Sequence, residues 1–471
     1  MRKATKLYVL LGVLLVICAA AFAVSRYQEK KENIKNSGEV ILEIPTDSVT
    51  ALSWTNESGT FSFTKDKMWA YDDDTAFPVS EKKVEDKLSQ FESFTASFVI
   101  DEVEDYAQYG LDDPVCTIFV TAGEESYTIK LGDFSKMDEQ RYVSIDDGKV
   151  YLVMHDPLDE FDAVLRDMIL DDTIPKFDTV DEITFSGSEN YTVIRDENGK
   201  SIDANDIFFV DGKPLDTDNV NSFLSKIKSL SLTNYASYNV TDEELAAFGL
   251  NDPDLTIKLA YSKKEDEGNV EESEILLLSI SRNTEEAEAY EKAVDKDEDE
   301  LPDVTGYVRV GQSQIVYEIS QSVYDQLTAV SYDTLRHQKL FTADFDSITS
   351  IDVTLSGEDY TFTYTPPEDK DDKDAEGTWI YNEKEFDVYD LKTALRAVSA
   401  SSFTEETPTG QEEISLTVHL DNEEIPTFTL TFYRYDGTNC LAAVDGRTVA
   451  FVSRSQTVDL IEAVNGLTLG G

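Results

Sequence analysis

Three stretches of the chain decide the fold: DSVTALSW at 47–54, DTVDEITF at 178–185 and DSITSIDV at 346–353. After the opening Asp of each stretch, apolar residues fall three apart and then two apart at matching places. A second alternating stretch follows each of them, as FSFTKD, YTVIRD and YTFTYT. Alternation with a period of two predicts strands that bury one face. The body of the protein is therefore predicted to contain three copies of one unit.

Each copy continues with a predicted helix, near Ser80–Phe94, Asp216–Leu230 and Asp387–Val398. Within these ranges apolar residues recur at helical spacing, and Ser80 and Asp216 are predicted N-caps. Each copy then ends with a hairpin whose turn contains Gly, followed by a second helix. These closing helices are predicted near Leu158–Met168, Ser322–Ala329 and Ser455–Ala463.

The order of elements in one copy is predicted to be β-β-β-α-β-β-β-β-α. Consecutive strands joined by short turns favour a mainly antiparallel sheet with helices packed on it, so the fold class is α+β. The three tandem repeats are predicted to cover 45–173, 174–341 and 342–471. The second repeat is stretched by an acidic, charge-rich insertion at 262–300.

A local motif marks the first two copies, YGLDDP at 109–114 and FGLNDP at 248–253, whereas the third copy keeps only Gly410. Gly permits backbone angles that other residues avoid, and Asp-Pro fixes a turn into the next strand. We interpret the motif as a rigid structural turn with an aromatic anchor. Its residues are Tyr109, Gly110, Leu111, Asp113 and Pro114 in the first copy and Phe248, Gly249, Leu250, Asp252 and Pro253 in the second.

The N-terminus carries an uncharged apolar run at 7–25, which follows a short tail with three cations at 1–6. About 20 apolar residues span a bilayer as a helix, so 7–25 is predicted to be an uncleaved transmembrane anchor. Ala21-Phe22-Ala23 matches an A-x-A pattern, which makes a cleaved signal peptide the alternative. The short tail is typical of export signals and predicts a single-pass membrane protein whose body is extracytoplasmic. Residues 26–44 are predicted to form a polar juxtamembrane linker.

The composition is strongly acidic. The chain has 471 residues, with 95 Asp and Glu against 40 Lys and Arg, and a formal net charge of −55. Phosphate binding needs clustered cations, so this charge argues against a nucleic-acid partner. Cys116 and Cys440 each lie in a strand-like stretch, where two buried free thiols are favoured over a disulfide between them.

Residues that could carry chemistry are scattered along the chain. His155, His337 and His419 each stand alone in a different copy, which argues against metal binding by imidazole. Neither a P-loop nor a nucleophile elbow occurs, so no catalytic residue and no cofactor is predicted. We therefore expect a protein that is not an enzyme.

One acidic run offers a weak calcium candidate. Its alternating carboxylates could converge on one hard cation. Glu300 stands where a calcium loop needs Gly, and Gly306 stands where the loop needs a closing Glu, so a solvated acidic insertion is favoured instead. The candidate ligands are Asp295, Asp297, Asp299 and Asp303.

The N-terminal anchor, the two turns, Leu131-Gly132-Asp133 and Tyr142-Val143 resemble the bacterial domain-of-unknown-function family 4340. The resemblance implies a membrane-anchored extracytoplasmic protein, and some members are encoded beside ABC-type transport components similar to those of gliding-motility systems. We therefore expect a non-enzymatic accessory or interaction subunit of an ABC-type transport system, with membrane lipid and a protein of that system as partners. The alternatives are a cell-envelope hydrolase and an extracytoplasmic solute- or cation-binding module.

Overall fold

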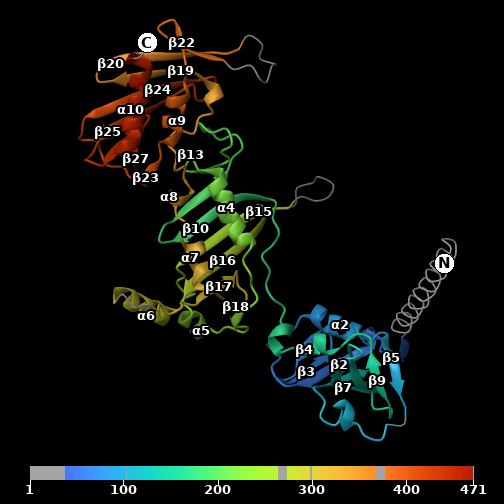
Figure 1. The fold of residues 1–471 in the computed structure, drawn as a ribbon. Coiled ribbons are helices and arrows are strands. Elements are labelled where there is room, and N and C mark those ends of the chain that lie inside the picture. Colours follow the sequence, from blue (N-terminus) through green and yellow to red (C-terminus); the bar gives the residue numbers. More distant parts are fainter. Residues whose placement is uncertain (1–37, 102, 264–272, 297–299, 368–376, 470–471) are drawn as a thin grey trace, which may run out of the picture. The chain divides into compact units, whose positions relative to one another are not determined.

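A computed structural model describes residues 38–101, 103–263, 273–296, 300–367 and 377–469. The chain divides into two compact units, Met1–Asp172 and Thr173–Gly471. Unit 1 contains one nine-stranded antiparallel sheet, and unit 2 contains two more (Figure 1). The prediction of repeated α+β units that are mostly antiparallel sheet is therefore confirmed.

The sheet of unit 1 has the strand order β1-β5-β9-β8-β7-β6-β2-β3-β4. Its strands are β1 (Glu39–Leu42), β2 (Val49–Asn56), β3 (Gly59–Lys65), β4 (Trp69–Tyr71), β5 (Phe94–Ile100), β6 (Cys116–Ala122), β7 (Glu125–Ser135), β8 (Gln140–Ser144) and β9 (Val150–Val153). Its helices are α2 (Glu81–Ser89) and α3 (Leu158–Phe161), with 3-10 helices η1 (Thr46–Ser48), η2 (Ala107–Tyr109) and η3 (Leu165–Met168).

The first sheet of unit 2 has the order β13-β12-β11-β10-β15-β16-β17-β18-β14. Its strands are β10 (Thr179–Gly187), β11 (Tyr191–Arg195), β12 (Phe208–Val210), β13 (Lys213–Pro214), β14 (Tyr235–Ser237), β15 (Leu255–Ser262), β16 (Glu274–Arg282), β17 (Gly306–Val310) and β18 (Val316–Ile319). The helices of this repeat are α4 (Thr217–Lys228), α5 (Asp242–Ala247), α6 (Thr284–Asp295), α7 (Gln321–Thr328) and α8 (Tyr332–Leu335).

The second sheet of unit 2 has the order β22-β21-β20-β19-β24-β25-β26-β27-β23. Its strands are β19 (Ile348–Leu355), β20 (Glu358–Thr365), β21 (Thr378–Tyr381), β22 (Lys384–Phe386), β23 (Ala400–Phe403), β24 (Glu412–Leu420), β25 (Thr427–Arg434), β26 (Asn439–Val444) and β27 (Arg447–Ser453). Its helices are α9 (Tyr389–Ala397) and α10 (Arg454–Leu469), with η4 (Phe345–Ser347) before the first strand.

Eight strands follow the same order in all three sheets. In unit 1 this order is β4-β3-β2-β6-β7-β8-β9-β5, and the two sheets of unit 2 repeat it from β12 to β14 and from β21 to β23. The ninth strand differs, because β1 joins the β5 edge of its sheet, whereas β13 and β22 join the opposite edge. The repeat is therefore the eight-stranded sheet, and each copy carries one edge strand of its own.

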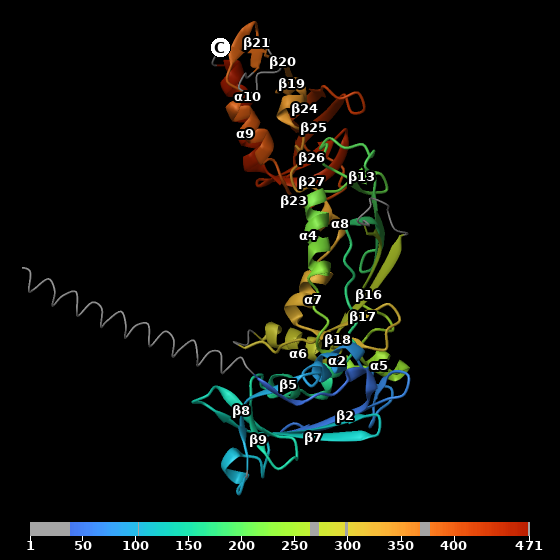
Figure 2. The same cartoon turned by 90° about the vertical axis from the view of Figure 1, so that its right-hand side faces the viewer.

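Each sheet buries one face under helices. In the last repeat α10 packs against α9 and against β24, β26 and β27, and Figure 2 shows both helices on the same side of that sheet. In unit 1 the side chains of Trp54, Phe63 and Leu88 are 0 to 2% exposed. Burying one such side chain contributes about 1.5–3 kcal/mol, so the covered faces stabilise the units.

The helix starts follow the local sequence. Ser80 accepts a hydrogen bond from the backbone N–H of Lys83, and Asp216 accepts hydrogen bonds from Asp218 and Asn219. Both predicted N-caps are therefore confirmed. Cys116 and Cys440 are free and fully buried, as favoured from the sequence.

Three sequence expectations need correction. The linker predicted at 26–44 contains β1, which pairs with β5 and precedes the buried Ile44. The acidic insertion predicted at 262–300 contains β16 and α6, because the apolar run ILLLSI outweighs the charges around it. The single helix predicted over Leu158–Met168 is divided into α3 and η3.

The predicted anchor at 7–25 and tail at 1–6 lie outside the described residues. Among the residues that the structure does describe, no helix combines the length and apolar character needed to cross a bilayer.

Candidate functional site

The first turn motif begins at Tyr109, the last residue of η2, and ends at Pro114, shortly before β6. Gly110 has a φ of +65°, and a Cβ atom at this position would lie 2.7 Å from Cγ of Asp133. The ring of Tyr109 lies 4.9 Å from that of Tyr142, centroid to centroid, and Leu111 is 4% exposed. The turn is therefore held to the sheet by an aromatic pair and a buried leucine.

The second motif has the same geometry. Gly249 has a φ of +73°, the rings of Phe248 and Tyr307 lie 4.7 Å apart, and Leu250 is 8% exposed. In both repeats the aromatic residue of the turn thus packs on the tyrosine of a Tyr-Val strand. The remaining motif residues lie at least partly exposed, directly before β6 and β15: Asp113, Pro114, Asp252 and Pro253.

The calcium candidate is described only in part. Asp295 is the last residue of α6, and Asp303 precedes β17. Asp297 and Asp299 lie outside the described residues, so calcium binding by this run stays a prediction.

The three histidines have different surroundings. His155 is exposed. The Nε2 atom of His419 lies 2.7 Å from Oδ2 of Asp352, on the last sheet. His337 lies in the segment that joins the two repeats of unit 2 and meets carboxylates from more than 100 residues earlier in the chain.

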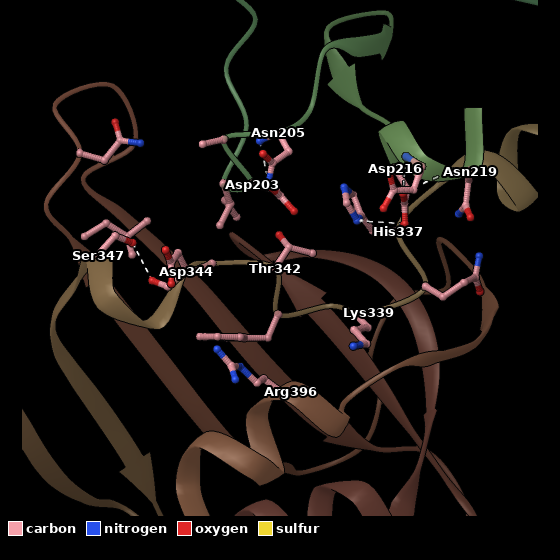
Figure 3. Close-up of a pocket in the computed structure, with 18 of the residues that line it drawn as sticks. Asp203, Asn205, Asp216, Asn219, His337, Lys339, Thr342, Asp344, Ser347 and Arg396 are labelled. Carbon is pink, nitrogen blue, oxygen red and sulfur yellow. Dashed lines mark hydrogen bonds and ion pairs between the residues drawn. The ribbon is translucent and has the colours of Figure 1, made fainter. Parts of the chain in front are cut away.

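A hollow of about 1000 Å³ surrounds His337 within unit 2. One wall is formed by the loop at 202–205 and the start of α4, and the other by the joining segment, α9 and the turn at 420–422. Figure 3 shows Asp203 and Asn205 on the first wall, and Lys339, Thr342 and Arg396 on the side of the last repeat. The lining is mixed, with apolar residues such as Phe341 beside polar residues and charges of both signs.

His337 lies between two carboxylates. Its Nε2 atom is 2.9 Å from Oδ1 and 2.8 Å from Oδ2 of Asp206, and its Nδ1 atom is 3.6 Å from Oδ2 of Asp216. Asp206 is only 6% exposed and also accepts a hydrogen bond of 2.6 Å from Ser201. Asp203 belongs to the same tight turn, since the backbone N–H of Asp206 donates to its carbonyl oxygen at 3.2 Å.

The charges around His337 change its protonation. Burial lowers the pKa of His337, but the hydrogen bond and charge of Asp206, with the charges of Asp216 and Asp203, outweigh burial. The net result is a pKa of His337 above its ordinary value. The carboxylates therefore favour the protonated form of the imidazole.

Backbone and side-chain contacts fix the joining segment to both repeats. The carbonyl of Arg336 accepts a hydrogen bond from Nδ2 of Asn219, and the N–H of Asp216 donates to the carbonyl of Leu335. On the other side, the guanidinium of Arg336 lies 3.7 Å from the ring centroid of Phe403. The position of His337 is therefore set by α4 and by the last repeat together.

Nothing in the sequence pairs His337 with Asp206. They are 131 residues apart, and the local pattern at 203–206 is an ordinary acidic turn. Sequence reasoning therefore placed His337 among isolated histidines, whereas the structure groups it with three carboxylates.

A second candidate site is the open face of the sheet in unit 1. Outward positions on β3, β2, β6 and β7 pair across the strands in three rows, and all are at least partly exposed. We call this surface the hydroxyl face, and it comprises Ala51, Ser53, Thr55, Thr60, Ser62, Thr64, Thr117, Phe119, Thr121, Ser126, Thr128 and Lys130.

The hydroxyl face differs from the rest of this acidic chain. None of its positions carries a carboxylate, Lys130 is its single cation, and Phe119 in the middle row is 46% exposed. Hydroxyls pair across the strands, as in the 2.9 Å contact between the Oγ1 atoms of Thr55 and Thr60. The open face of the last sheet is also rich in hydroxyls but carries Asp352, Asp359 and His419.

The comparison with family models gives one result. A model described as a domain of unknown function, DUF4340, matches residues 69–207 and 211–417. The first segment begins at β4 and ends just before β12. β12 holds the position in the first sheet of unit 2 that β4 holds in the sheet of unit 1. The searches of curated proteins and of solved structures gave no match. Because the matched segments cover most of the sequence, as the turn motifs indicated, the chain belongs to the DUF4340 family.

Proposed function

We propose that the protein is a non-enzymatic interaction subunit on the outer side of the cell membrane, where it serves an ABC-type transport system. The hydroxyl face is the observation that carries the proposal. The membrane location is supported by the uncharged run at 7–25. The transport role is supported by the resemblance of the turn motifs to a family in which some members are encoded beside ABC-type transport components.

The physical argument starts from the charge. With a formal net charge of −55, most surfaces of this chain repel other acidic surfaces. The cores of protein interfaces are depleted of charged residues and enriched in aromatic ones. The hydroxyl face has no carboxylate among its positions and a single cation, Lys130, and it places one aromatic side chain, Phe119, in its middle row. It is therefore the surface of unit 1 that we propose for contact with a neutral protein surface.

The partner that we propose is the extracytoplasmic part of a membrane component of the transporter. The paired hydroxyls of the face offer donors and acceptors to polar groups of that partner, and Phe119 supplies an apolar anchor. An exposed aromatic side chain at the centre of an interface can contribute about 2 kcal/mol or more to binding.

Site-specific photocrosslinking in intact cells tests the proposal. A photoreactive amino acid at Phe119 is expected to crosslink a membrane-embedded or ATP-binding component of an ABC-type transporter. The matched control places the same amino acid at Met137, which is 89% exposed and lies outside the hydroxyl face. A transporter component captured from Phe119 and not from Met137 supports the proposal.

The opposite results overturn it. Capture of the same proteins from both positions would show that the hydroxyl face is not the interface. Capture of no transporter component from Phe119 would show the same. Phe119→Glu adds a charge to the face without disturbing the core, and it is expected to lower the yield of the captured component at least about 10-fold.

A further inference from the structure

We infer that Asp203, Asp206 and His337 bind a divalent transition-metal ion, zinc being the best suited, in the wall of the hollow in unit 2. This site is independent of the hydroxyl face and of the transport role. It adds a binding function that the family assignment does not contain.

The ligand atoms are already close together. One carboxylate oxygen from each aspartate and one ring nitrogen of His337 all lie within 4.8 Å of one another. Ligands about 2.0–2.2 Å from a tetrahedral zinc ion lie about 3.3–3.6 Å apart. Nε2 of His337 and the Asp206 oxygens, now 2.8–2.9 Å apart, need to separate slightly, and Asp203 needs to move inward.

Asp206, which is buried, and His337, which is partly exposed, each have a partner that orients the side chain. Oδ2 of Asp216 faces Nδ1 of His337 at 3.6 Å, while Oδ1 of the same carboxylate caps α4. The hydroxyl of Ser201 donates to Oδ2 of Asp206. A carboxylate behind the second nitrogen of a ligating histidine is a regular feature of metal sites, because it fixes the ring and makes the ligating nitrogen more basic.

The kinds of ligand favour a transition metal. Calcium and magnesium prefer sites made wholly of oxygen, whereas imidazole together with carboxylate suits zinc and its neighbours. Asp206 lies behind the wall, while Asp203 and His337 line the hollow. Three protein ligands on one side leave a coordination position on the open side for water or a solute, as in zinc sites that keep one position free.

The alternative is an ion pair that only holds the joining segment in place. In that case one imidazolium faces Asp206 and Asp216, and Asp203 acts on it only through its charge. The two arrangements differ in zinc binding, because a site that is only an ion pair binds no added zinc.

The test is a calorimetric titration of the full-length protein, purified in detergent and freed of bound metal with EDTA. We expect one zinc ion per chain, bound at micromolar concentration or tighter, with no competition from millimolar calcium or magnesium. His337→Asn and Asp206→Asn are each expected to weaken zinc binding by more than about 100-fold, because a direct ligand is lost. Asp203→Asn tests the third ligand and leaves the contact between Asp206 and His337 in place.

Two matched variants separate metal binding from structure. His419→Asn removes another histidine that is bonded to an aspartate, and it is expected to leave zinc binding unchanged. Asp216→Asn keeps the helix cap, since Asn caps as well as Asp, but removes the charge behind His337, and it is expected to cost about 10–100-fold.

A variant with a spectroscopic signal separates the loss of a ligand from the loss of the fold. His337→Cys replaces imidazole with a thiolate, and with cobalt(II) in place of zinc it is expected to show a thiolate-to-cobalt charge-transfer band absent from the parent protein. Absence of zinc binding in the parent protein overturns the inference. Binding that survives His337→Asn, or calcium that displaces zinc at equal concentration, overturns it as well.

Discussion

At the scale of single residues, Asp352 on the open face of the last sheet stabilises the folded state through its contacts with Thr361 and His419. Thr361 donates a hydrogen bond of 2.7 Å to its Oδ1 atom, and His419 lies 2.7 Å from Oδ2. Burial raises the pKa of the Asp352 carboxyl, but these hydrogen bonds outweigh burial and hold it below the ordinary value of 3.8. The ionised carboxylate is therefore favoured in the folded state.

This pKa sets the pH dependence of Asp352→Asn. A carboxyl whose pKa is lowered by folding stabilises the protein above its unfolded pKa and loses that effect as the pH falls through the folded pKa. Because the Asp352 side chain is 47% exposed, we expect the variant to lose only about 0.5 kcal/mol at neutral pH. Urea unfolding at neutral pH and at a pH below the lowered pKa of Asp352 measures the difference, which should disappear once the carboxyl is protonated in the folded state. A loss of the same size at both values contradicts the assignment.

At the scale of elements, the turn after η2 depends on one backbone angle and one close contact. Gly110→Ala is expected to destabilise unit 1 by about 2 kcal/mol, because Ala is strained at a φ of +65° and its Cβ meets Asp133 at 2.7 Å. The matched control is Gly123→Ala. Gly123 has a φ of +61° but open space around it, so only the backbone strain of about 1 kcal/mol remains. If urea denaturation gives equal losses in the free energy of unfolding for the two variants, the contact with Asp133 contributes nothing to stability.

Elements set by local sequence were predictable, and elements set by distant contacts were not. The alternating strands, the caps at Ser80 and Asp216 and the Gly turns depend on neighbours in the sequence. The helix predicted over 158–168 fails because the carbonyl of Ala163 accepts hydrogen bonds from Trp54 and Asn56 on β2, which takes it out of a helix. The site at His337 could not be predicted from the sequence for the same reason, because its carboxylates lie more than 100 residues away in the chain.

At the scale of the whole molecule, each unit has its own core, so the two are expected to unfold separately. Leu88→Ala in unit 1 and Leu395→Ala in unit 2 each remove a side chain that is no more than 2% exposed. Each is expected to cost about 2–5 kcal/mol and to lower only one of two thermal transitions. Differential scanning calorimetry of the full-length protein measures both. A single transition that both substitutions shift equally would show that the units unfold as one.

The edge strand β1 gives unit 1 a mechanical property. It is four residues long and pairs with β5 alone, through a register interrupted between Val40 and Leu42. A pulling force applied to the chain before Glu39 therefore loads the pairing of β1 with β5 first. Peeling β1 away releases about 13–14 Å of extended chain at roughly 3.3–3.6 Å per residue, while the other eight strands stay paired. The pairing of β1 can therefore open under load without loss of the eight-stranded sheet that all three copies share.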